Sequence, residues 1–326
     1  MKKQILVIGA GAWGTALANH LANNDSNVLL YTRNLTTLQE INKSKTNFQK
    51  LPNIILHSNL LATNNYNENI QNIDIVFIVV PSANCFEVFQ QIAVSNFHPK
   101  TIFVMCSKGF GVKNKQIKLL SEIFSEVTNH QNFAVLSGPN FALEVAKKQP
   151  TITTVASKNY NIANEIILCL NNENFFAQYS ANILTTEIAG IFKNIMAIGC
   201  GFLDALDFGY NAKSALVCRG IAEIKILCNF FKTESDLVTA AGFGDIFLTC
   251  SSLLSRNYRF GFALGKKQNI DKNITYEGAI ACNLLADFAV NQQIPLDLCK
   301  VIAKIINNQH QNDCFILKQL NSAILQ

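Results

Sequence analysis

The feature that most constrains this chain is the hexapeptide GAGAWG at residues 9–14, which directly follows the apolar run Ile5–Ile8. The small and apolar residues that come next, including Thr15, Leu17 and Ala18, predict that a helix opens at the glycines. A strand, a GxGxxG turn and a helix together form the fingerprint of a dinucleotide-binding βαβ unit. The alternative is a small-residue turn before a packed helix.

Each glycine of this fingerprint has its own task. The first makes the tight turn, the second lets the backbone approach a pyrophosphate, and the third lets the helix pack closely on the strand. The phosphates then meet free N–H groups and the positive end of the helix dipole. We therefore predict cofactor contacts from Gly9, Gly11, Ala12, Trp13 and Gly14.

Short apolar runs alternate with helical stretches up to about residue 180. The predicted strands are 4–8, 27–32, 74–80, 101–106, 133–136 and 151–156. Most are continuous apolar runs, as expected of parallel strands covered by helices on both faces. Beyond residue 185 the pattern is helical, at 187–206, 212–231, 258–264 and 277–290. The predicted fold is α/β, with a Rossmann-type parallel-sheet domain at residues 1–185 followed by an all-α domain at residues 186–326.

Composition limits the possible classes of protein. A length of 326 residues suits two domains, and a net charge of +5 without a dense Lys/Arg run does not favour a nucleic-acid partner. No stretch has the ~20 uninterrupted apolar residues of a membrane span. Ten scattered cysteines and five dispersed histidines predict a reducing, cytoplasmic location and no metal site. Asparagine is abundant, at 39 residues, and we expect most of these in turns and at solvent positions.

The end of the second predicted strand bears on which dinucleotide is bound. An acidic residue about 20 positions after the glycines usually bonds the ribose of NAD, whereas an arginine accommodates the 2′-phosphate of NADP. Here the strand ends Tyr31-Thr32-Arg33-Asn34, without an acid. Arg33 therefore favours NADP(H), or use of both NADP(H) and NAD(H). The alternative is a solvated arginine at a strand end.

Polar groups also follow the later strands. Lys108 lies in Ser107-Lys108-Gly109 after one strand, and the segment SGPNFA at residues 137–142 follows another. Open α/β sheets bind ligands outside the carboxyl ends of their strands. We therefore expect Lys108 to be a cation facing cofactor or substrate, with a surface lysine as the alternative.

A charged residue interrupts the most apolar predicted helix. Lys193 and Asn194 lie in the middle of the segment 187–198, whose remaining residues are apolar nearly all round. Burial lowers the pKa of a lysine toward the range that suits proton transfer at neutral pH. Lys193 is thus a candidate general acid/base. The alternative is that its ammonium reaches solvent while only the stem is buried.

Two further segments carry polar groups. The glycine-flanked turn at residues 240–245 presents Asp245, and the tripeptide Ser255-Arg256-Asn257 follows. A guanidinium with neighbouring hydroxyl and amide donors suits a phosphate. The alternative for the tripeptide is a helix cap with a solvated charge.

The chain resembles the bacterial-type NAD(P)-dependent glycerol-3-phosphate dehydrogenases nearly end to end. The resemblance rests on motifs in a characteristic order, namely GAGAWGTALA at 9, VPS at 80, SKG at 107, SGPNFALEVA at 137, KN at 193, NAKSAL and RG from 211, GFGDIFLTC at 242, SRNYRFGFALG at 255 and YEG at 276. It implies interconversion of dihydroxyacetone phosphate and sn-glycerol 3-phosphate for glycerophospholipid synthesis. We also expect a homodimer.

The resemblance implies residue roles. Lys193 would be the catalytic acid/base, held in register by Asn194 and Asp245, and Lys108 would lie between cofactor and substrate. The substrate-binding residues would be Lys108, Gly138, Asn140, Lys193, Asn194, Asp245, Ser255, Arg256 and Asn257. Ala142, Arg256, Thr275 and Glu277 would join the cofactor site.

The sequence departs from the family's usual pattern at three positions. Asn140 replaces a common Ser or Thr, Phe192 a common Leu, and Tyr276 a common Val, and none of these changes removes a catalytic group. Two other functions stay open at this level: a β-hydroxyacid dehydrogenase of the same two-domain plan, and a non-enzymatic NADP-sensing protein.

Overall fold

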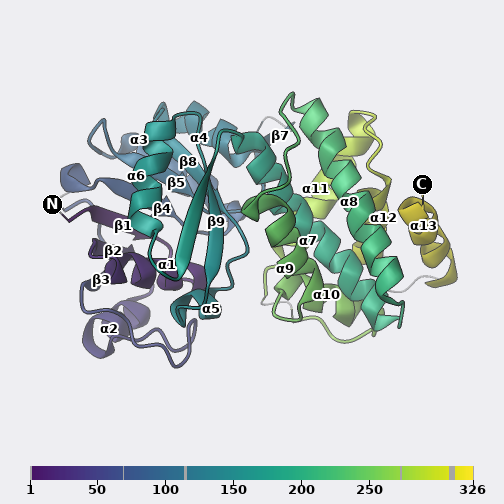
Figure 1. Ribbon diagram of the computed structural model, residues 1–326, viewed down its shortest axis with the longest axis horizontal. Coiled ribbons are helices and arrows are strands. Elements are labelled where there is room, and N and C mark those ends of the chain that lie inside the picture. Colours follow the sequence, from purple (N-terminus) through teal and green to yellow (C-terminus); the bar gives the residue numbers. More distant parts are fainter. Residues whose placement is uncertain (1, 69, 114–115, 272–273, 308–312, 326) are drawn as a thin grey trace. The chain divides into compact units, whose positions relative to one another are not determined.

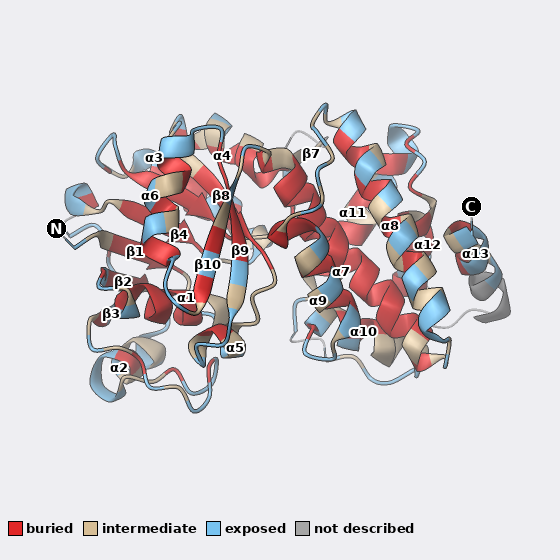
Figure 2. Ribbon diagram, in the orientation of Figure 1, coloured by how far each residue is buried: buried red, intermediate tan, exposed pale blue. Residues whose placement is uncertain are grey.

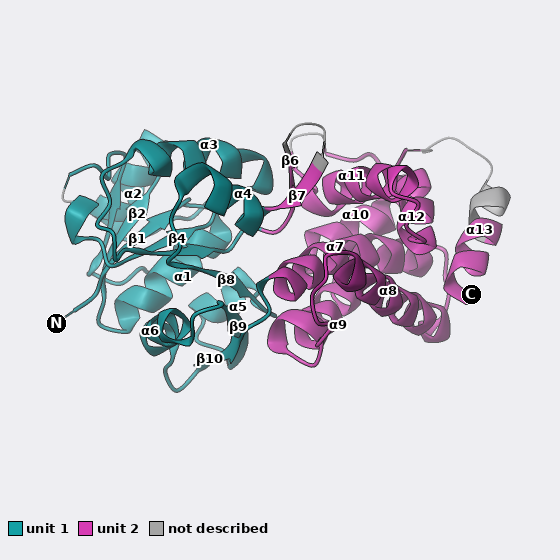
Figure 3. Ribbon diagram, turned by 90° about the horizontal axis from the view of Figure 1, so that it is seen from above, with its two compact units in different colours: residues 1–107, 120–183 teal, residues 108–119, 184–326 magenta. Residues whose placement is uncertain are grey.

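The computed structural model describes residues 2–68, 70–113, 116–271, 274–307 and 313–325 (Figure 1). The chain divides into two compact units, coloured separately in Figure 3. Unit 1 comprises Met1–Ser107 and Leu120–Ile183, and unit 2 comprises Lys108–Leu119 and Leu184–Gln326. The segment 108–119 thus belongs with the C-terminal helices. The predicted single boundary between residues 185 and 186 places this segment in the N-terminal domain. The predicted class, a Rossmann-like sheet followed by helices, is confirmed.

Unit 1 is built on one eight-stranded sheet. Its strands are β1 (Gln4–Ile8), β2 (Asn27–Tyr31), β3 (Leu60–Thr63), β4 (Ile75–Ile78), β5 (Ile102–Met105), β8 (Phe133–Ser137), β9 (Thr151–Ala156) and β10 (Phe175–Ser180). They lie in the order β10-β9-β8-β5-β4-β1-β2-β3. From β3 to β8 this is the strand order of dinucleotide-binding folds. The sequence predicted six of these strands and missed β3 and β10.

The pair β8 and β9 corrects the prediction of a wholly parallel sheet, because these two strands are antiparallel. Their connection contains only α5 (Ala142–Ala146), whose five residues form a helix about 7.5 Å long. The five residues of β8 span about 17 Å. So short a helix does not return the chain to the edge where β8 begins, and β9 therefore runs back in the opposite direction.

Helices cover both faces of the sheet. They are α1 (Ala12–Asn23), α2 (Leu35–Ser44), α3 (Ser82–Val94), α4 (Leu120–Thr128) and α6 (Tyr160–Leu170), with a short 3₁₀ turn at Ile70–Asn72. Alternate residues of a strand enter two separate cores: Ile102 and Val104 of β5 pack with α1 and α6, whereas Phe103 and Met105 pack with α3 and α4. Figure 3 shows α3 and α4 on one side of the sheet and α1 and α6 on the other. Burial on both faces explains the continuous apolar runs in the sequence.

Unit 2 is helical apart from one hairpin. Its helices are α7 (Ile183–Ala205), α8 (Tyr210–Phe230), α9 (Asp245–Ser251), α10 (Arg256–Gly265), α11 (Glu277–Asn291), α12 (Asp297–Asn307) and α13 (Asp313–Leu325). The hairpin pairs β6 (Phe110–Lys113) with β7 (Gln116–Leu119). The four predicted helices correspond to α7, α8, α10 and α11, whereas α9, α12 and α13 were not predicted.

Helix α7 is the core of unit 2. Side chains from α8 to α12 pack against it, and Figure 2 shows it buried along most of its length. Among the described residues, α7 alone has the length and apolar composition of a membrane-crossing helix, but its apolar stretch lies almost entirely inside the protein. It therefore has the surroundings of a core helix.

Candidate active site

The glycine-rich turn after β1 has the shape that the sequence predicts. Gly9 has a φ of +118°, and a Cβ at Gly9 would overlap the carbonyl oxygen of Val79 at the end of β4. A Cβ at Gly14 would overlap the carbonyl oxygen of Gly9. At Gly11, in contrast, no atom lies within 4 Å of the place a Cβ would take. The first and third glycines are thus required by packing, while the second faces open space that a ligand can approach.

The start of α1 is equally suited to a phosphate. Gly11 is the N-cap residue and has no side chain with which to bond the first N–H groups of the helix. Ala12 and Trp13 form the beginning of this helix. The turn also follows β1, which lies between β2 and β4. The strand order reverses at this point, because β2 and β3 lie on one side of β1, and β4 and β5 lie on the other. Both observations fit a dinucleotide pyrophosphate.

Arg33 follows β2 on the surface of unit 1. Its side chain is 70% exposed, and Nη1 lies 3.8 Å from Oε1 of Glu87, which is itself 55% exposed. An ion pair this long and this exposed to water holds the guanidinium weakly. Arg33 can therefore reorient toward another anion at little cost.

The segment after β8 is tied to β9. A Cβ at Gly138 would lie 2.8 Å from Cα of Thr153, so only glycine allows this approach. Nδ2 of Asn140 donates to the carbonyl oxygen of Ile152 at 3.0 Å, and Oδ1 accepts from the hydroxyl of Thr153 at 3.0 Å. The side chain of Asn140 thus uses both of its ends within unit 1, and Ala142 opens the short helix α5.

A cluster of charged side chains lies inside unit 2. Nζ of Lys193 donates to Oδ1 of Asp245 and, at 3.0 Å, to the hydroxyl of Thr249. Nζ of Lys108 donates to Oδ2 of the same Asp245 at 2.6 Å. Lys193 is 7% exposed and Asp245 only 1%. The interpretation of Lys193 as a lysine that reaches solvent is therefore wrong, and its ammonium is buried in an ion pair.

The charges in this cluster shift one another's protonation. Burial lowers the pKa of Lys193 to about 7, and the charge of Lys108 adds to this effect while Asp245 opposes it. Burial also tends to raise the pKa of Asp245, but the two ammonium groups and their hydrogen bonds outweigh it and hold that pKa below its usual value. Asp245 is thus ionised, while Lys193 exchanges its proton near neutral pH.

A tight turn delivers Asp245 to the cluster. The segment Ala240–Gly244, which precedes α9, is kinked at Gly242, whose φ and ψ of −86° and −105° are not helical. A Cβ at Gly242 would overlap the carbonyl oxygen of Leu237. Thr249 lies one helical turn after Asp245, and its hydroxyl donates to Oδ1 at 3.2 Å. Thr249 follows this turn in the sequence but was not among the predicted site residues, although its i, i+4 spacing from Asp245 indicates that the two side chains meet on one helix.

The other substrate candidates of unit 2 differ in their surroundings. Ser255 is the N-cap of α10 and accepts from the N–H of Tyr258 at 3.3 Å, and Oδ1 of Asn257 accepts from the N–H of Gly278 at 3.1 Å. The helix-cap interpretation is thus confirmed for Ser255. Arg256 is exposed and bonds no described residue, and neither does the side chain of Asn194, which follows Lys193 directly.

The start of α11 closes this region. A Cβ at Gly278 would lie 2.7 Å from Oδ1 of Asn257 and 2.8 Å from the carbonyl oxygen of Asn194. The ring of Tyr276 stacks on Phe260, with 4.3 Å between centroids, which accounts for an aromatic residue at this position. Thr275 and Glu277, on either side of Tyr276, are exposed and half-buried respectively.

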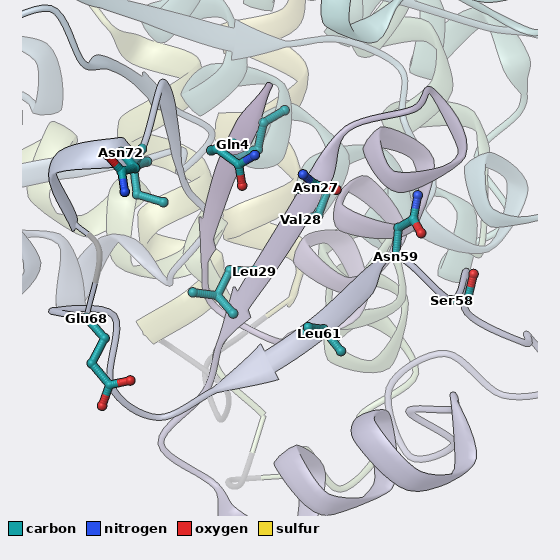
Figure 4. A pocket seen from close by; sticks show the side chains of 11 residues that line it. Gln4, Asn27, Val28, Leu29, Ser58, Asn59, Leu61, Glu68 and Asn72 are labelled. Atoms are coloured by element: carbon teal, nitrogen blue, oxygen red, sulfur yellow. The ribbon is translucent and has the colours of Figure 1, made fainter. Parts of the chain in front are cut away.

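The fold also contains a hollow that does not belong to this chemistry. A cavity of about 830 Å³ opens beside Gln4, Asn27 and Asn59, where β1 and β2 begin and just before β3 (Figure 4). The glycine turn lies at the opposite, carboxyl ends of these strands. Within the described residues, no three His, Cys, Asp or Glu side chains are grouped as metal ligands. The nine cysteines with described side chains are free thiols, and eight of them are buried.

Comparison with known proteins decides the family. Residues 4–163 match the profile of the N-terminus of NAD-dependent glycerol-3-phosphate dehydrogenase, and residues 182–316 match that of its C-terminus. The chain belongs to this family. It is 34% identical to glycerol-3-phosphate dehydrogenase [NAD(P)+] of Neorickettsia sennetsu over 98% of this chain and 96% of that relative. The identity to the enzyme of the same name from Macrococcus caseolyticus is 37%, over 89% and 87% of the two chains.

The solved structures agree with this membership. The crystal structure of glycerol-3-phosphate dehydrogenase from Coxiella burnetii superposes with a TM-score of 0.90 at 29% identity, and covers 100% of this chain and 99% of its own. As a member of the glycerol-3-phosphate dehydrogenase family, the protein is an NAD(P)-dependent oxidoreductase. The family assigned from the sequence motifs is confirmed.

Proposed function

We propose that this enzyme interconverts dihydroxyacetone phosphate and sn-glycerol 3-phosphate, with Lys193 as the group that gives and takes the proton. The single observation that carries this proposal is the buried pair of Lys193 and Asp245. An ammonium in such surroundings has a purpose beyond stability, because a buried pair adds little to folding free energy once desolvation is counted.

The proposed chemistry follows from where charge develops. Reduction of a ketone builds negative charge on its oxygen, and the protonated Nζ of Lys193 stabilises that charge and then donates its proton. In the reverse direction the neutral amine takes the proton from the alcohol. Asp245 and Thr249 hold Nζ in place. With Lys108, the cluster carries a net positive charge while Lys193 is protonated, which suits an anionic substrate.

Substrate contacts are proposed from the groups around Lys193. Arg256 binds no described residue, and its guanidinium suits the phosphate of the substrate. The amide of Asn194 suits a substrate hydroxyl. The family resemblance adds Ser255 and Asn257 of unit 2, and Gly138 and Asn140 of unit 1, to the proposed substrate-binding residues.

The cofactor site is proposed at the glycine turn of unit 1. Gly9, Gly11, Ala12, Trp13 and Gly14 would hold the pyrophosphate, with Arg33 at the ribose and its 2′-phosphate. Ala142, Thr275, Glu277, Lys108 and Arg256 would make further contacts. When bound, the nicotinamide supplies or accepts the hydride.

We also propose that the product enters glycerophospholipid synthesis in the cytoplasm, and that the chain forms a homodimer. The free, mostly buried cysteines support a reducing compartment. Sedimentation of the purified protein measures the oligomeric state directly, and a single monomeric species would contradict the dimer.

One assay tests the proposed reaction. NADPH oxidation is followed by its absorbance with dihydroxyacetone phosphate, with a 3-oxo acid, and with no substrate. We expect consumption with the triose phosphate alone. Consumption with the 3-oxo acid would instead indicate a β-hydroxyacid dehydrogenase, and binding of NADPH without turnover would indicate a sensing protein.

A further inference from the structure

A buried asparagine far along the chain is bonded to the glycine turn. Asn47 lies in the segment between α2 and β3 and is 1% exposed. Its Nδ2 donates to the carbonyl oxygen of Ala10 at 3.1 Å and to the hydroxyl of Thr15 at 2.8 Å. Ala10 is the second residue of the turn, and Thr15 lies in the first turns of α1. One amide group thus joins the glycine turn to the helix that follows it.

The bond to Ala10 fixes a peptide plane. Because a trans peptide is planar, the carbonyl of Ala10 and the N–H of Gly11 point in opposite directions. Asn47 holds the carbonyl oxygen toward the protein interior, so the N–H of Gly11 is directed away from Asn47. Outside its neighbouring residues and its own helix, Gly11 has no atom within 4 Å of the Cβ position, so a ligand can approach this residue closely.

The segment that carries Asn47 is itself held firmly. Its carbonyl oxygen accepts from the N–H groups of Lys50 and Leu51, at 3.1 and 2.7 Å. Both neighbours of Asn47 are bonded to Glu40 of α2, whose Oε1 accepts from the hydroxyl of Thr46 at 2.8 Å and from the N–H of Phe48 at 2.7 Å. These hydrogen bonds fix the backbone on both sides of Asn47, as is required of a residue that positions another group.

We propose that Asn47 is a positioning residue for cofactor binding, which aims the Gly11 N–H at the pyrophosphate by holding the Ala10–Gly11 peptide. The inference rests on the proposed binding of the cofactor at residues 9–14. Without the side-chain donors of Asn47, the peptide is free to rotate and the carbonyl oxygen of Ala10 can face the phosphate. Cofactor affinity then falls, whereas the groups that act on the substrate are unchanged.

The test uses the single tryptophan of the chain, Trp13, which lies in the turn itself. NADPH is titrated into the full-length enzyme, and the emission of Trp13 reports the dissociation constant. We expect Asn47→Ala to raise the Kd for NADPH about tenfold, or about 1.4 kcal/mol, as befits two hydrogen bonds. Asn47→Asp, which keeps the shape and lacks the donors, should raise it at least as much. The kcat at saturating NADPH and the KM for dihydroxyacetone phosphate should stay within about twofold.

A matched control separates positioning from stability. Asn42 of α2 also makes two bonds to backbone, to the carbonyl oxygen and the N–H of Ala62, at 2.9 and 2.8 Å. Asn42→Ala should lower Tm without changing the Kd for NADPH. If the Asn47 variants do not fold, Thr15→Val keeps the test available, because it replaces the hydroxyl that accepts from Asn47 by a methyl group and should raise the Kd. Thr15→Ser keeps the hydroxyl and should leave the Kd unchanged.

The outcomes distinguish this inference from the proposal beneath it. Gly11→Val should abolish NADPH binding, and an unchanged Kd in that variant would overturn the cofactor site at the turn and the role of Asn47 together. A loss of binding in Gly11→Val with an unchanged Kd in both Asn47 variants would overturn only the role of Asn47. The role of Asn47 would also be overturned if Asn47→Ala changed kcat, the Kd for NADPH and the KM for dihydroxyacetone phosphate by equal factors.

Discussion

The candidate sites of the two units are built by opposite physical means. In unit 1 the candidate cofactor site is made of backbone: Gly9, Gly11 and Gly14 shape a turn that carries no charged side chain, and the nearby Arg33 is largely exposed. In unit 2 the candidate catalytic site is made of charges, and Lys193 and Asp245 are buried on helices. A pyrophosphate can be bound by N–H groups and shape, whereas proton transfer requires a titratable group in a controlled environment.

This difference also decides how substitutions act. A residue of the turn matters through the space that it leaves free, so that any larger side chain is damaging. A residue of the charged cluster matters through its chemical group, so that even an isosteric replacement changes the protonation of its neighbours. Substitutions in each unit test whether the two units keep these separate roles.

The largest effect is expected at Lys193. Lys193→Ala should reduce kcat by about three orders of magnitude, since a positioned acid contributes roughly 10²–10⁴, while the Kd for NADPH stays within about twofold. Stopped-flow turnover and Trp13 emission measure the two quantities. Lys225→Ala, on the exposed surface of α8, serves as the control. Near-normal turnover would remove Lys193 from the mechanism, and a large loss of NADPH affinity would break the separation of roles.

The second effect concerns stability, at another buried carboxylate of unit 2. Glu223 of α8 accepts from the N–H groups of Leu298 and Cys299 at the start of α12, at 2.7 and 3.1 Å. Burial raises the pKa of Glu223 to about 7, from 4.5. The folded state therefore binds this proton more tightly than the unfolded state does. The contribution of protonated Glu223 to the free energy of unfolding is fully present below pH 4.5 and is lost as the pH rises through about 7. That loss is about 3 kcal/mol at 1.36 kcal/mol per pKa unit.

Urea unfolding between pH 4.5 and 8 measures this contribution. Glu223→Gln resembles the protonated form, so its free energy of unfolding should lack the decrease between pH 4.5 and 8 that Glu223 causes. The exposed Glu68→Gln should keep the slope of the unchanged protein. Parallel profiles for the protein with and without Glu223→Gln would show that this carboxyl does not titrate in the range.

A third prediction concerns the pH dependence of turnover. With the pKa of Lys193 at about 7, reduction of the ketone should decline above pH 7, while oxidation of the alcohol should rise to a plateau above it. Lys108→Met removes a like charge and should move this midpoint to higher pH. Asp245→Asn removes the opposing charge and should move it to lower pH. Profiles of kcat against pH, measured for reduction and for oxidation, give this midpoint. Shifts of the same sign in both variants would contradict its assignment to Lys193.

The smallest effect is expected at the surface of unit 1. Arg33→Asp should weaken NADPH binding about tenfold more than NADH binding, because one guanidinium–phosphate contact is lost in water. Titrations of both cofactors provide the measurement, with Glu87→Gln as the control for the neighbouring carboxylate. Equal losses for NADPH and NADH would assign Arg33 to the surface alone.

The asparagines show how far composition can be interpreted. Some have a turn conformation as expected, such as Asn53 and Asn129, which have positive φ. Asn34 and Asn159 cap the starts of α2 and α6, a role that was not predicted. Others are structural in ways that composition does not reveal. Asn171 and Asn172 accept from the N–H groups of Ala177 and Phe175, on the side of the edge strand β10 that faces away from β9. These bonds occupy an edge that would otherwise be open to another strand.

The sequence by itself determined what depends on neighbouring residues. The strand, glycine turn and helix at the N-terminus are contiguous, as are the apolar runs of the sheet and the apolar helix α7. Local spacing and hydrophobic pattern are therefore sufficient for them. The strands β3 and β10 escaped this reasoning because they are the two edge strands, whose residues alternate in burial and do not form a continuous apolar run. The hairpin of β6 and β7 was also missed, and the reversal at β9 depends on the short connection through α5.

Only the tertiary structure decided which polar groups meet. Lys108, Lys193, Asp245 and Thr249 come from three separate segments, and their shared hydrogen bonds turn four ordinary residues into one titrating cluster. Asn47 reaches the glycine turn from more than 30 residues away in the same manner. Burial and charge proximity are properties of the folded arrangement, so the pKa of Lys193 and the direction of the Gly11 N–H are set by packing that no local sequence pattern encodes.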